Sequence, residues 1–209
     1  WAAADRVRAA FGGEVGVVPN GMDLDTWAPA EAASGAAAGA AAGARDRGPL
    51  RCVATMRLAP RKRGLALLGI VEDALTQLPP GSLTLEIIGD GPDRAAMARS
   101  IARRGLAEAV TLRGRLPREE VRAAYRRTDV FVAPAALEAF GIAALEARAA
   151  GLVVVARAGT GIAEFVTDGV DGLLVDDDAR MARSLVGLVR DPALLGRLAA
   201  HARLHRPVQ

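Results

Sequence analysis

Short apolar runs recur along the chain, and stretches with helical spacing separate them. The runs are rich in β-branched residues and predict strands at residues 15–18, 51–56, 83–88, 110–113, 130–133, 153–156 and 172–175. Between most of them apolar side chains recur every three or four positions, as in residues 65–71, which predicts helices. Strands that are apolar throughout and alternate with helices are typical of a parallel sheet covered on both faces. The pattern therefore predicts an α/β fold with a doubly wound parallel sheet, of the Rossmann type.

Three segments fall outside this alternation. Residues 1–13 are expected to be a helix or linker leading in from a preceding domain that is missing, since the chain opens at Trp1 without an initiator Met. Residues 28–48 are rich in Ala and Gly without periodic large apolar side chains, which predicts a low-complexity surface insertion. Residues 14–203 carry the alternating pattern and are expected to form one domain, followed by a truncated tail at 204–209.

Composition narrows the classes of partner. The 27 Lys and Arg residues are mixed with 24 Asp and Glu residues, giving a net charge of +3, and aromatic residues make up only 3% of the chain. No basic block is interleaved with aromatic side chains, so the sequence argues against a nucleic-acid partner. No apolar stretch reaches the roughly 18 to 20 residues that a membrane span needs. A soluble, cytoplasmic protein is expected.

Residues that often form disulfides or bind metals are few. Cys52 is the only cysteine, which excludes an internal disulfide, and its apolar neighbours predict a buried strand position. His201 and His205 have the spacing of a metal-binding pair on a helix but no third ligand is evident, so no metal site is expected. The three aspartates at 176–178 are expected to form the solvated beginning of a helix.

Candidate chemistry lies in the loops that follow strands, because ligands of such sheets bind beyond the carboxyl ends of the strands. The loop after residues 51–56 carries Arg57 and Lys62, the only lysine of the chain. A guanidinium fork and a compact ammonium both suit phosphate oxygens. The next loop contains Gly89 and Gly91, which permit a tight turn or a close backbone approach but lack the third glycine of a dinucleotide fingerprint.

The stretch "EAFGIAALE" at residues 138–146 places two glutamates around a glycine. Gly141 lies where a helix is predicted to begin, so unpaired backbone N–H groups and the positive end of the helix would face the crevice. Glu146 lies one turn into this helix and would accept hydrogen bonds from neighbouring hydroxyls, such as the diol of a ribose. The backbone of "GRLP" at 114–117 is a candidate for reading the edge of a base.

The ordered set of these motifs resembles a known family. The motifs "VVPNGMD", "MRLAPRKRG", "IIGDGP", "GRLPREEV", "VFVAPAALEAFGIAALEARAAG" and "AGTGIAEFV" resemble the donor-binding half of retaining glycosyltransferases of family 4, which have the GT-B fold. The resemblance covers roughly residues 14–200. It implies a Rossmann-like C-terminal half of a GT-B enzyme, preceded by an N-terminal domain that binds the acceptor.

The resemblance also implies roles for particular residues. Catalytic roles fall on Arg57 and Lys62, which neutralise the diphosphate, and on Glu138, which lies by the donor sugar and the diphosphate. Glu146 binds the ribose hydroxyls. Further donor contacts are implied for Gly89 and Gly91, for the base at Arg115 and Leu116, and for the sugar and phosphates at Phe140, Gly141 and Ile142. The sequence departs from the family pattern at Met56, Arg63, Ala135 and Thr160, which obscures the sugar preference.

The implied activity is transfer of a sugar from a nucleoside-diphosphate donor, UDP- or GDP-linked, to an acceptor hydroxyl, without a metal or other cofactor. The acceptor, a glycan, lipid or small molecule, would be held by the N-terminal domain, which could also touch a membrane surface. Two alternatives stay open. One is a non-catalytic nucleotide-sugar-binding or scaffold module. The other is a sugar-nucleotide epimerase on a related scaffold, which would need its own acid and base, whereas histidine occurs only at positions 201 and 205.

Overall fold

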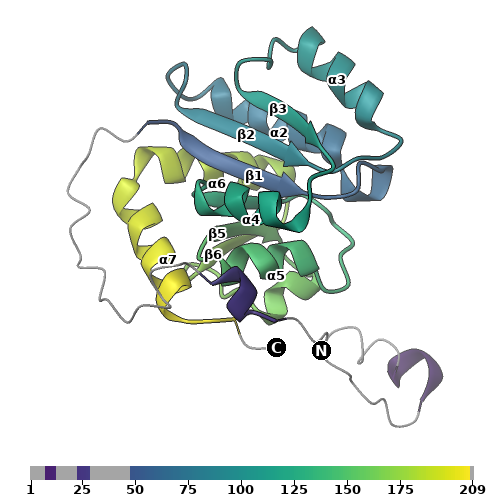
Figure 1. The fold of residues 1–209 in the computed structure, drawn as a ribbon, viewed down its shortest axis with the longest axis vertical. Coiled ribbons are helices and arrows are strands. Elements are labelled where there is room, and N and C mark those ends of the chain that lie inside the picture. Colours follow the sequence, from purple (N-terminus) through teal and green to yellow (C-terminus); the bar gives the residue numbers. More distant parts are fainter. Residues whose placement is uncertain (1–7, 13–22, 29–47, 208–209) are drawn as a thin grey trace.

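A six-stranded parallel sheet forms the centre of the computed structural model, which describes residues 8–12, 23–28 and 48–207. The strand order is β3-β2-β1-β4-β5-β6 (Figure 1). The strands are β1 (Leu50–Thr55), β2 (Leu83–Ile88), β3 (Val110–Gly114), β4 (Val130–Ala133), β5 (Val153–Arg157) and β6 (Gly172–Val175). The predicted doubly wound parallel sheet is confirmed. The strand predicted at 15–18 and nearly all of the insertion predicted at 28–48 lie outside the described residues.

Helices cover both faces of the sheet. Figure 1 shows α4 and α5 in front of the sheet, with α2 and α6 behind it. The helices are α2 (Gly64–Leu75), α3 (Arg94–Arg103), α4 (Arg118–Arg126), α5 (Ile142–Ala149), α6 (Asp178–Arg190) and α7 (Pro192–Leu204). Short 3-10 helices are η1 (Asp25–Trp27), η3 (Pro60–Lys62) and η4 (Gly161–Glu164). None of the described helices is long and apolar enough to cross a bilayer.

Two apolar cores result from the alternation of side chains along each strand. In β5, Val153 and Val155 pack in one core with α2, α3, α6 and α7, whereas Val154 and Ala156 pack in the other with α4 and α5. Cys52 is buried in the first core, as predicted. Trp27 of η1 packs in the second core, so a residue that precedes the sheet contributes to the α4–α5 side.

The direction of winding reverses between β1 and β4. The chain runs from β1 outwards to β2 and β3, and then returns to β4 before it continues to β5 and β6. β1 and β4 pair in parallel through Cys52 with Val130 and Val53 with Phe131. A crevice opens at such a reversal, beyond the carboxyl ends of the two strands. The loops after β1 and β4 carry Lys62 and Glu138, so the topology alone brings these side chains to one place.

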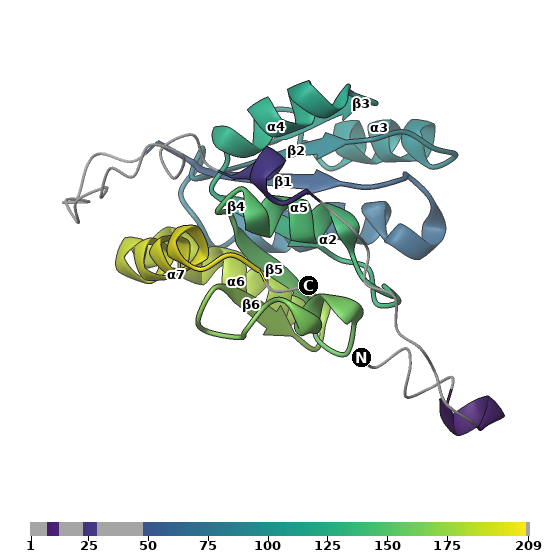
Figure 2. The same cartoon turned by 60° about the horizontal axis from the view of Figure 1, so that its bottom comes forward.

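A buried arginine ties the end of the chain to α5. Arg148 is 1% exposed, and its guanidinium pairs with the Asp171 carboxylate at 2.9 Å. It also donates to the carbonyl oxygens of Ala202 at 2.5 Å and His205 at 2.8 Å. Arg206 then pairs with Asp25, so the segment after α7 lies beside η1. Both short segments lie against the α5 side of the sheet (Figures 1 and 2).

Candidate functional site

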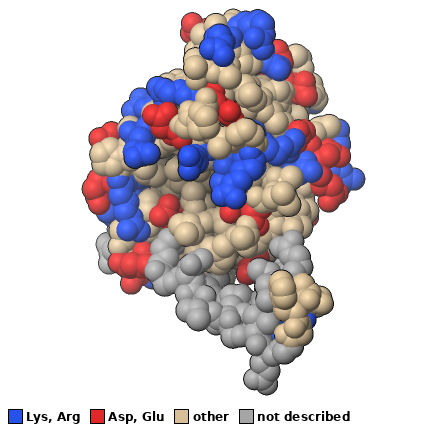
Figure 3. Space-filling model, turned by 90° about the vertical axis from the view of Figure 1, so that its right-hand side faces the viewer, with Lys and Arg blue, Asp and Glu red and all other residues tan. Residues whose placement is uncertain are grey.

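A pocket of about 980 Å³ lies beyond the carboxyl ends of β1, β2 and β4. Figure 3 looks onto this end of the sheet and shows Lys and Arg side chains gathered across the middle of the face. All eleven candidate residues from the sequence line the pocket: Arg57, Lys62, Gly89, Gly91, Arg115, Leu116, Glu138, Phe140, Gly141, Ile142 and Glu146. The structure thus brings the candidates together, while the role of each stays a prediction.

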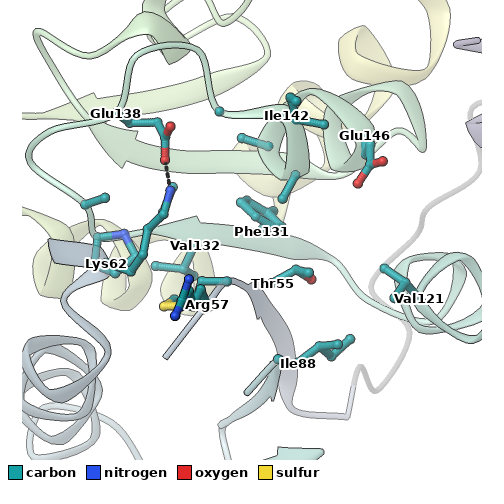
Figure 4. A pocket seen from close by; sticks show the side chains of 18 of the residues that line it. Thr55, Arg57, Lys62, Ile88, Val121, Phe131, Val132, Glu138, Ile142 and Glu146 are labelled. Atoms are coloured by element: carbon teal, nitrogen blue, oxygen red, sulfur yellow. Dashed lines mark hydrogen bonds and ion pairs between the residues drawn. The ribbon is translucent and has the colours of Figure 1, made fainter. Parts of the chain in front are cut away.

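Lys62 and Glu138 form an ion pair across the reversal of the sheet. The Lys62 ammonium, at the end of η3, donates to Glu138 Oε2 in the loop between β4 and α5 (Figure 4). Their side chains are only 23% and 20% exposed, so water screens the pair less than a surface pair. The ammonium is therefore not a bare cation in this structure. Among the described residues no carboxylate forms a salt bridge with Arg57 or Arg115.

Arg63, one of the departures from the family pattern, braces the loops that hold this pair. It adopts a left-handed backbone conformation with φ of 59°. Its guanidinium donates two hydrogen bonds to the Asp178 carboxylate, from Nη1 to Oδ1 at 2.9 Å and from Nη2 to Oδ2 at 2.7 Å. It also donates to the carbonyl oxygen of Pro134 at 3.1 Å, just before the loop that carries Glu138. Arg157 donates to Asp178 at 3.2 Å. The helix start predicted at 176–178 is confirmed, since α6 begins at Asp178 and Asp177 caps it, but the partly exposed Asp178 carboxylate also binds two guanidinium groups.

Glycines allow two pocket loops to approach each other closely. A Cβ on Gly91 would lie 2.3 Å from the carbonyl oxygen of Leu58, and the φ of Gly91 is 157°. Backbone therefore packs on backbone between the loops after β1 and β2. Gly141 precedes α5 with φ of 88°, and no side chain caps the helix. The first N–H groups of α5 are thus available to an anion in the pocket, with the positive end of the helix behind them.

Glu146 lies deeper along α5, at the end of the pocket nearest α4. Its side chain is 18% exposed, and Arg118 Nη2 of α4 lies 3.9 Å from its Oε1. Burial raises the pKa of Glu146, and the positive charge of Arg118 partly opposes this rise. An ionised carboxylate with few water partners is suited to accept hydrogen bonds from a vicinal diol.

The partial burial of Glu146 predicts a stabilising substitution. A carboxyl whose folded pKa is raised makes its full contribution to stability below the unfolded pKa and loses it as pH rises through the folded pKa. Glutamine does not ionise, so Glu146→Gln is expected to raise the melting temperature of the ligand-free chain at pH 7.5 and not at pH 4. Thermal unfolding at the two pH values measures this. A gain that does not grow with pH would contradict the assigned cause.

Sequence reasoning missed the contacts that surround the candidate residues. Arg118 closely follows Leu116 in "GRLPREEV", but only the fold shows that it faces Glu146. The Arg63–Asp178 contact joins residues 115 positions apart, and no local signal announces it. In the described residues no three His, Cys, Asp or Glu side chains are grouped as for a metal ion. The rings of His201 and His205 stack on each other, with 4.0 Å between the ring centroids.

Comparison with known proteins gives related sequences over most of the chain. The D-inositol 3-phosphate glycosyltransferase of Frankia alni is 35% identical over 198 residues, which cover 90% of this chain and 47% of that protein. The GDP-mannose-dependent alpha-(1-6)-phosphatidylinositol monomannoside mannosyltransferase of Mycolicibacterium smegmatis is 33% identical, with coverage of 90% and 50%. The chain therefore spans about half the length of the curated relatives it matches.

Solved structures share the fold. HepE of Anabaena in complex with UDP and glucose superposes with a TM-score of 0.76 at 23% identity, over 97% of this chain and 55% of that one. The C-terminal domain of LpcC, a glycosyl transferase group 1 family protein of Francisella tularensis, superposes with a TM-score of 0.68 at 21% identity, over 88% and 95%. These likenesses confirm the predicted Rossmann-like half of a GT-B fold. The family model for glycosyl transferases group 1 matches residues 49–191, and this chain belongs to that family.

Proposed function

We propose that this chain binds a nucleoside-diphosphate sugar and forms the donor half of a retaining glycosyltransferase. The observation that carries the proposal is one pocket that combines Arg57, the Lys62–Glu138 pair, the uncapped start of α5 and the partly buried Glu146. Cations and helix-end N–H groups suit a diphosphate, and a carboxylate one turn further suits a ribose diol. The UDP complex of HepE and the GDP-mannose dependence in the name of the mycobacterial relative agree with this ligand class.

In the proposed reaction the bond between the anomeric carbon and the diphosphate oxygen breaks, and the electron pair leaves with the diphosphate. Arg57, Lys62 and the start of α5 stabilise the developing negative charge because they are fixed before the reaction begins. The acceptor oxygen bonds to the anomeric carbon from the leaving-group face, and its proton passes to the departing diphosphate. Glu138 orients the sugar and Glu146 the ribose.

The epimerase alternative has less support from the pocket. Such an enzyme needs an acid and a base beside the sugar, and neither histidine of the chain lines the pocket. His201 and His205 lie at the end of α7, next to Asp171. A non-catalytic binding module would use the same pocket, and sugar transfer by a two-domain protein that contains this chain distinguishes it from an enzyme.

The ligand class is tested by calorimetric titration of the 209-residue chain with UDP, GDP and ADP, with the corresponding monophosphates and with the glucose conjugates of the diphosphates. We expect one nucleoside diphosphate to bind with a clear preference over the corresponding monophosphate, because the cations and the start of α5 act on the diphosphate. The absence of binding by all of these compounds would contradict the proposed function.

Metal independence is a separate expectation. The cations and the helix end already neutralise the diphosphate, so the affinity of UDP or GDP is expected to be the same in excess EDTA as in Mg²⁺ or Mn²⁺. Titrations under the three conditions measure this. Binding that requires a divalent cation would mean that a metal bridges the phosphates to the protein, and the assigned role of Arg57 and Lys62 would then be wrong.

A further inference from the structure

Arg118 lies between two groups that belong to different parts of the chain. Its guanidinium carbon is 5.1 Å from the centroid of the Trp27 ring, and its Nη2 is 3.9 Å from Glu146 Oε1. The first contact is a cation–π interaction and the second an ion pair without a hydrogen bond. Arg118 itself does not line the pocket, whereas Glu146 does.

Trp27 is well fixed, although it precedes the sheet. It is 4% exposed, and its ring lies 5.5 Å from the ring of Tyr125 on α4. Asp23 holds the turn before it by accepting hydrogen bonds from the N–H groups of Asp25 at 3.0 Å and Thr26 at 3.4 Å. A long exposed arginine gains little from a single ion pair because ordering its side chain costs entropy. A rigid indole face beneath the guanidinium lowers that cost.

We propose that Arg118 is a positioning residue for Glu146, that Trp27 holds it in place, and that nucleotide affinity therefore depends on the segment at residues 23–28. The inference rests on the proposed function, in which Glu146 binds the ribose diol. A carboxylate accepts strong hydrogen bonds from a diol only while it is ionised. Arg118 favours the ionised form and draws the carboxylate toward α4.

The charged and titratable groups around this contact are few in the described residues. Tyr125 of α4 faces Glu146, and burial raises the pKa of its hydroxyl, with the charge of Glu146 adding to the effect. Asp23, in the leading segment, also lies within the electrostatic reach of Arg118. Hydrogen bonds from Thr26 lower the pKa of Asp23, and Arg118 adds to this. Arg118 is thus the cation shared by Glu146 and the leading segment.

The test compares affinity for UDP, or for GDP if it binds better, in the 209-residue chain across pH 5 to 8. Loss of the Arg118 charge raises the pKa of Glu146 further. As pH falls, the variant therefore protonates Glu146 and loses nucleotide affinity at a higher pH than the wild-type chain does. We expect Arg118→Met to weaken binding about two- to fivefold at pH 7.5 and to move the midpoint of the pH profile upwards. The diphosphate also titrates, but equally for every variant.

Matched variants isolate the effect. Arg122→Met removes the same charge from the same helix and is expected to leave the profile unchanged, because Glu119 is the only carboxylate that Arg122 pairs with among the described residues. Trp27→Leu is expected to shift the pH profile in the same direction as Arg118→Met, whereas Trp27→Phe, which keeps an aromatic ring, is expected to give the wild-type profile. The double variant Arg118→Met/Trp27→Leu is expected to shift the profile no further than Arg118→Met alone. Thermal unfolding confirms that each variant is folded.

The outcomes separate the two proposals. A wild-type chain that binds no nucleoside diphosphate overturns the proposed function and this inference with it. Wild-type binding that falls with Glu146→Ala, together with an unchanged pH midpoint in Arg118→Met, overturns the inference alone. A midpoint that moves in Arg118→Met and not in folded Trp27→Leu overturns the part assigned to Trp27.

Discussion

Replacement of Glu146 with alanine is expected to weaken the binding of UDP or GDP by roughly 10- to 150-fold. Each hydrogen bond from a ribose hydroxyl to an ionised carboxylate contributes about 1.5–3 kcal/mol, and one such bond accounts for this range. Such a bond is expected to be strong at Glu146, because its side chain is only 18% exposed and water competes poorly for its oxygens. Calorimetric titration of the variant at pH 7.5 measures the loss.

Glu146→Ala is not expected to lower the free energy of unfolding of the ligand-free chain, because burial of the ionised carboxylate is itself unfavourable. Glu119→Ala is the matched control. The Glu119 side chain is 75% exposed on α4, and in the described part of the chain it pairs only with Arg122, three residues further along the same helix. A folded Glu146→Ala chain with wild-type affinity would show that the ribose lies elsewhere in the pocket.

The second large effect concerns stability. Arg148→Met is expected to lower the free energy of unfolding by about 3–5 kcal/mol, because it leaves the Asp171 carboxylate buried without its partner. For a domain of this size that corresponds to a fall in melting temperature of roughly 6–20 °C. The carbonyl oxygens of Ala202 and His205 also lose their donor. Thermal and urea unfolding measure the change.

Two further variants test the cause of this loss. In Arg148→Met/Asp171→Asn the buried charge is gone, while the amide oxygen of the introduced side chain can still accept the Thr167 N–H that Asp171 accepts at 2.9 Å, so part of the stability is expected to return. Arg51→Met breaks the Arg51–Asp129 pair, in which Arg51 is 55% exposed, and is expected to cost less than about 1 kcal/mol. Equal losses in Arg148→Met and Arg51→Met would mean that burial of the pair does not matter.

Most of the sheet could be predicted because each strand contains a short apolar run, and the central strands β4 and β5 are buried on both faces. The runs at 83–88, 130–133 and 172–175 coincide with β2, β4 and β6 to the residue. β3 and β5 extend one residue beyond the predicted runs, because Gly114 and Arg157 continue the hydrogen-bond ladder, whereas β1 begins and ends one residue earlier than predicted, at Leu50 and Thr55. The length of the hydrogen-bond ladder depends on the neighbouring strand, so it cannot be predicted from the periodicity of a single strand.

The pocket residues could be predicted for a different reason. In a parallel sheet the loops after the strands all meet at one edge, so residues that are distant in the sequence converge there without further information. The contacts made by Lys62, Arg63 and Arg118 are different in kind. They depend on side-chain directions from η3 to the β4–α5 loop, from the start of α2 to α6 and from α4 to α5, and these directions follow from packing. The family resemblance supplied a role for Lys62 but gave no sign that Glu138 would pair with it.

Because Lys62 is paired with Glu138, the cations of the pocket are expected to act at different steps of ligand binding. Arg57 and Arg115 have no carboxylate partner in the described part of the chain, so their field extends into solvent and accelerates the encounter with an anionic ligand. Salt screens this attraction over about 10 Å at roughly 0.1 M. Under the proposed function, we expect Lys62 to contact the ligand only after it has entered the pocket, when a phosphate replaces or joins Glu138. Substitution of either arginine is then expected to change mainly the association rate of the nucleotide, and substitution of Lys62 mainly its dissociation rate.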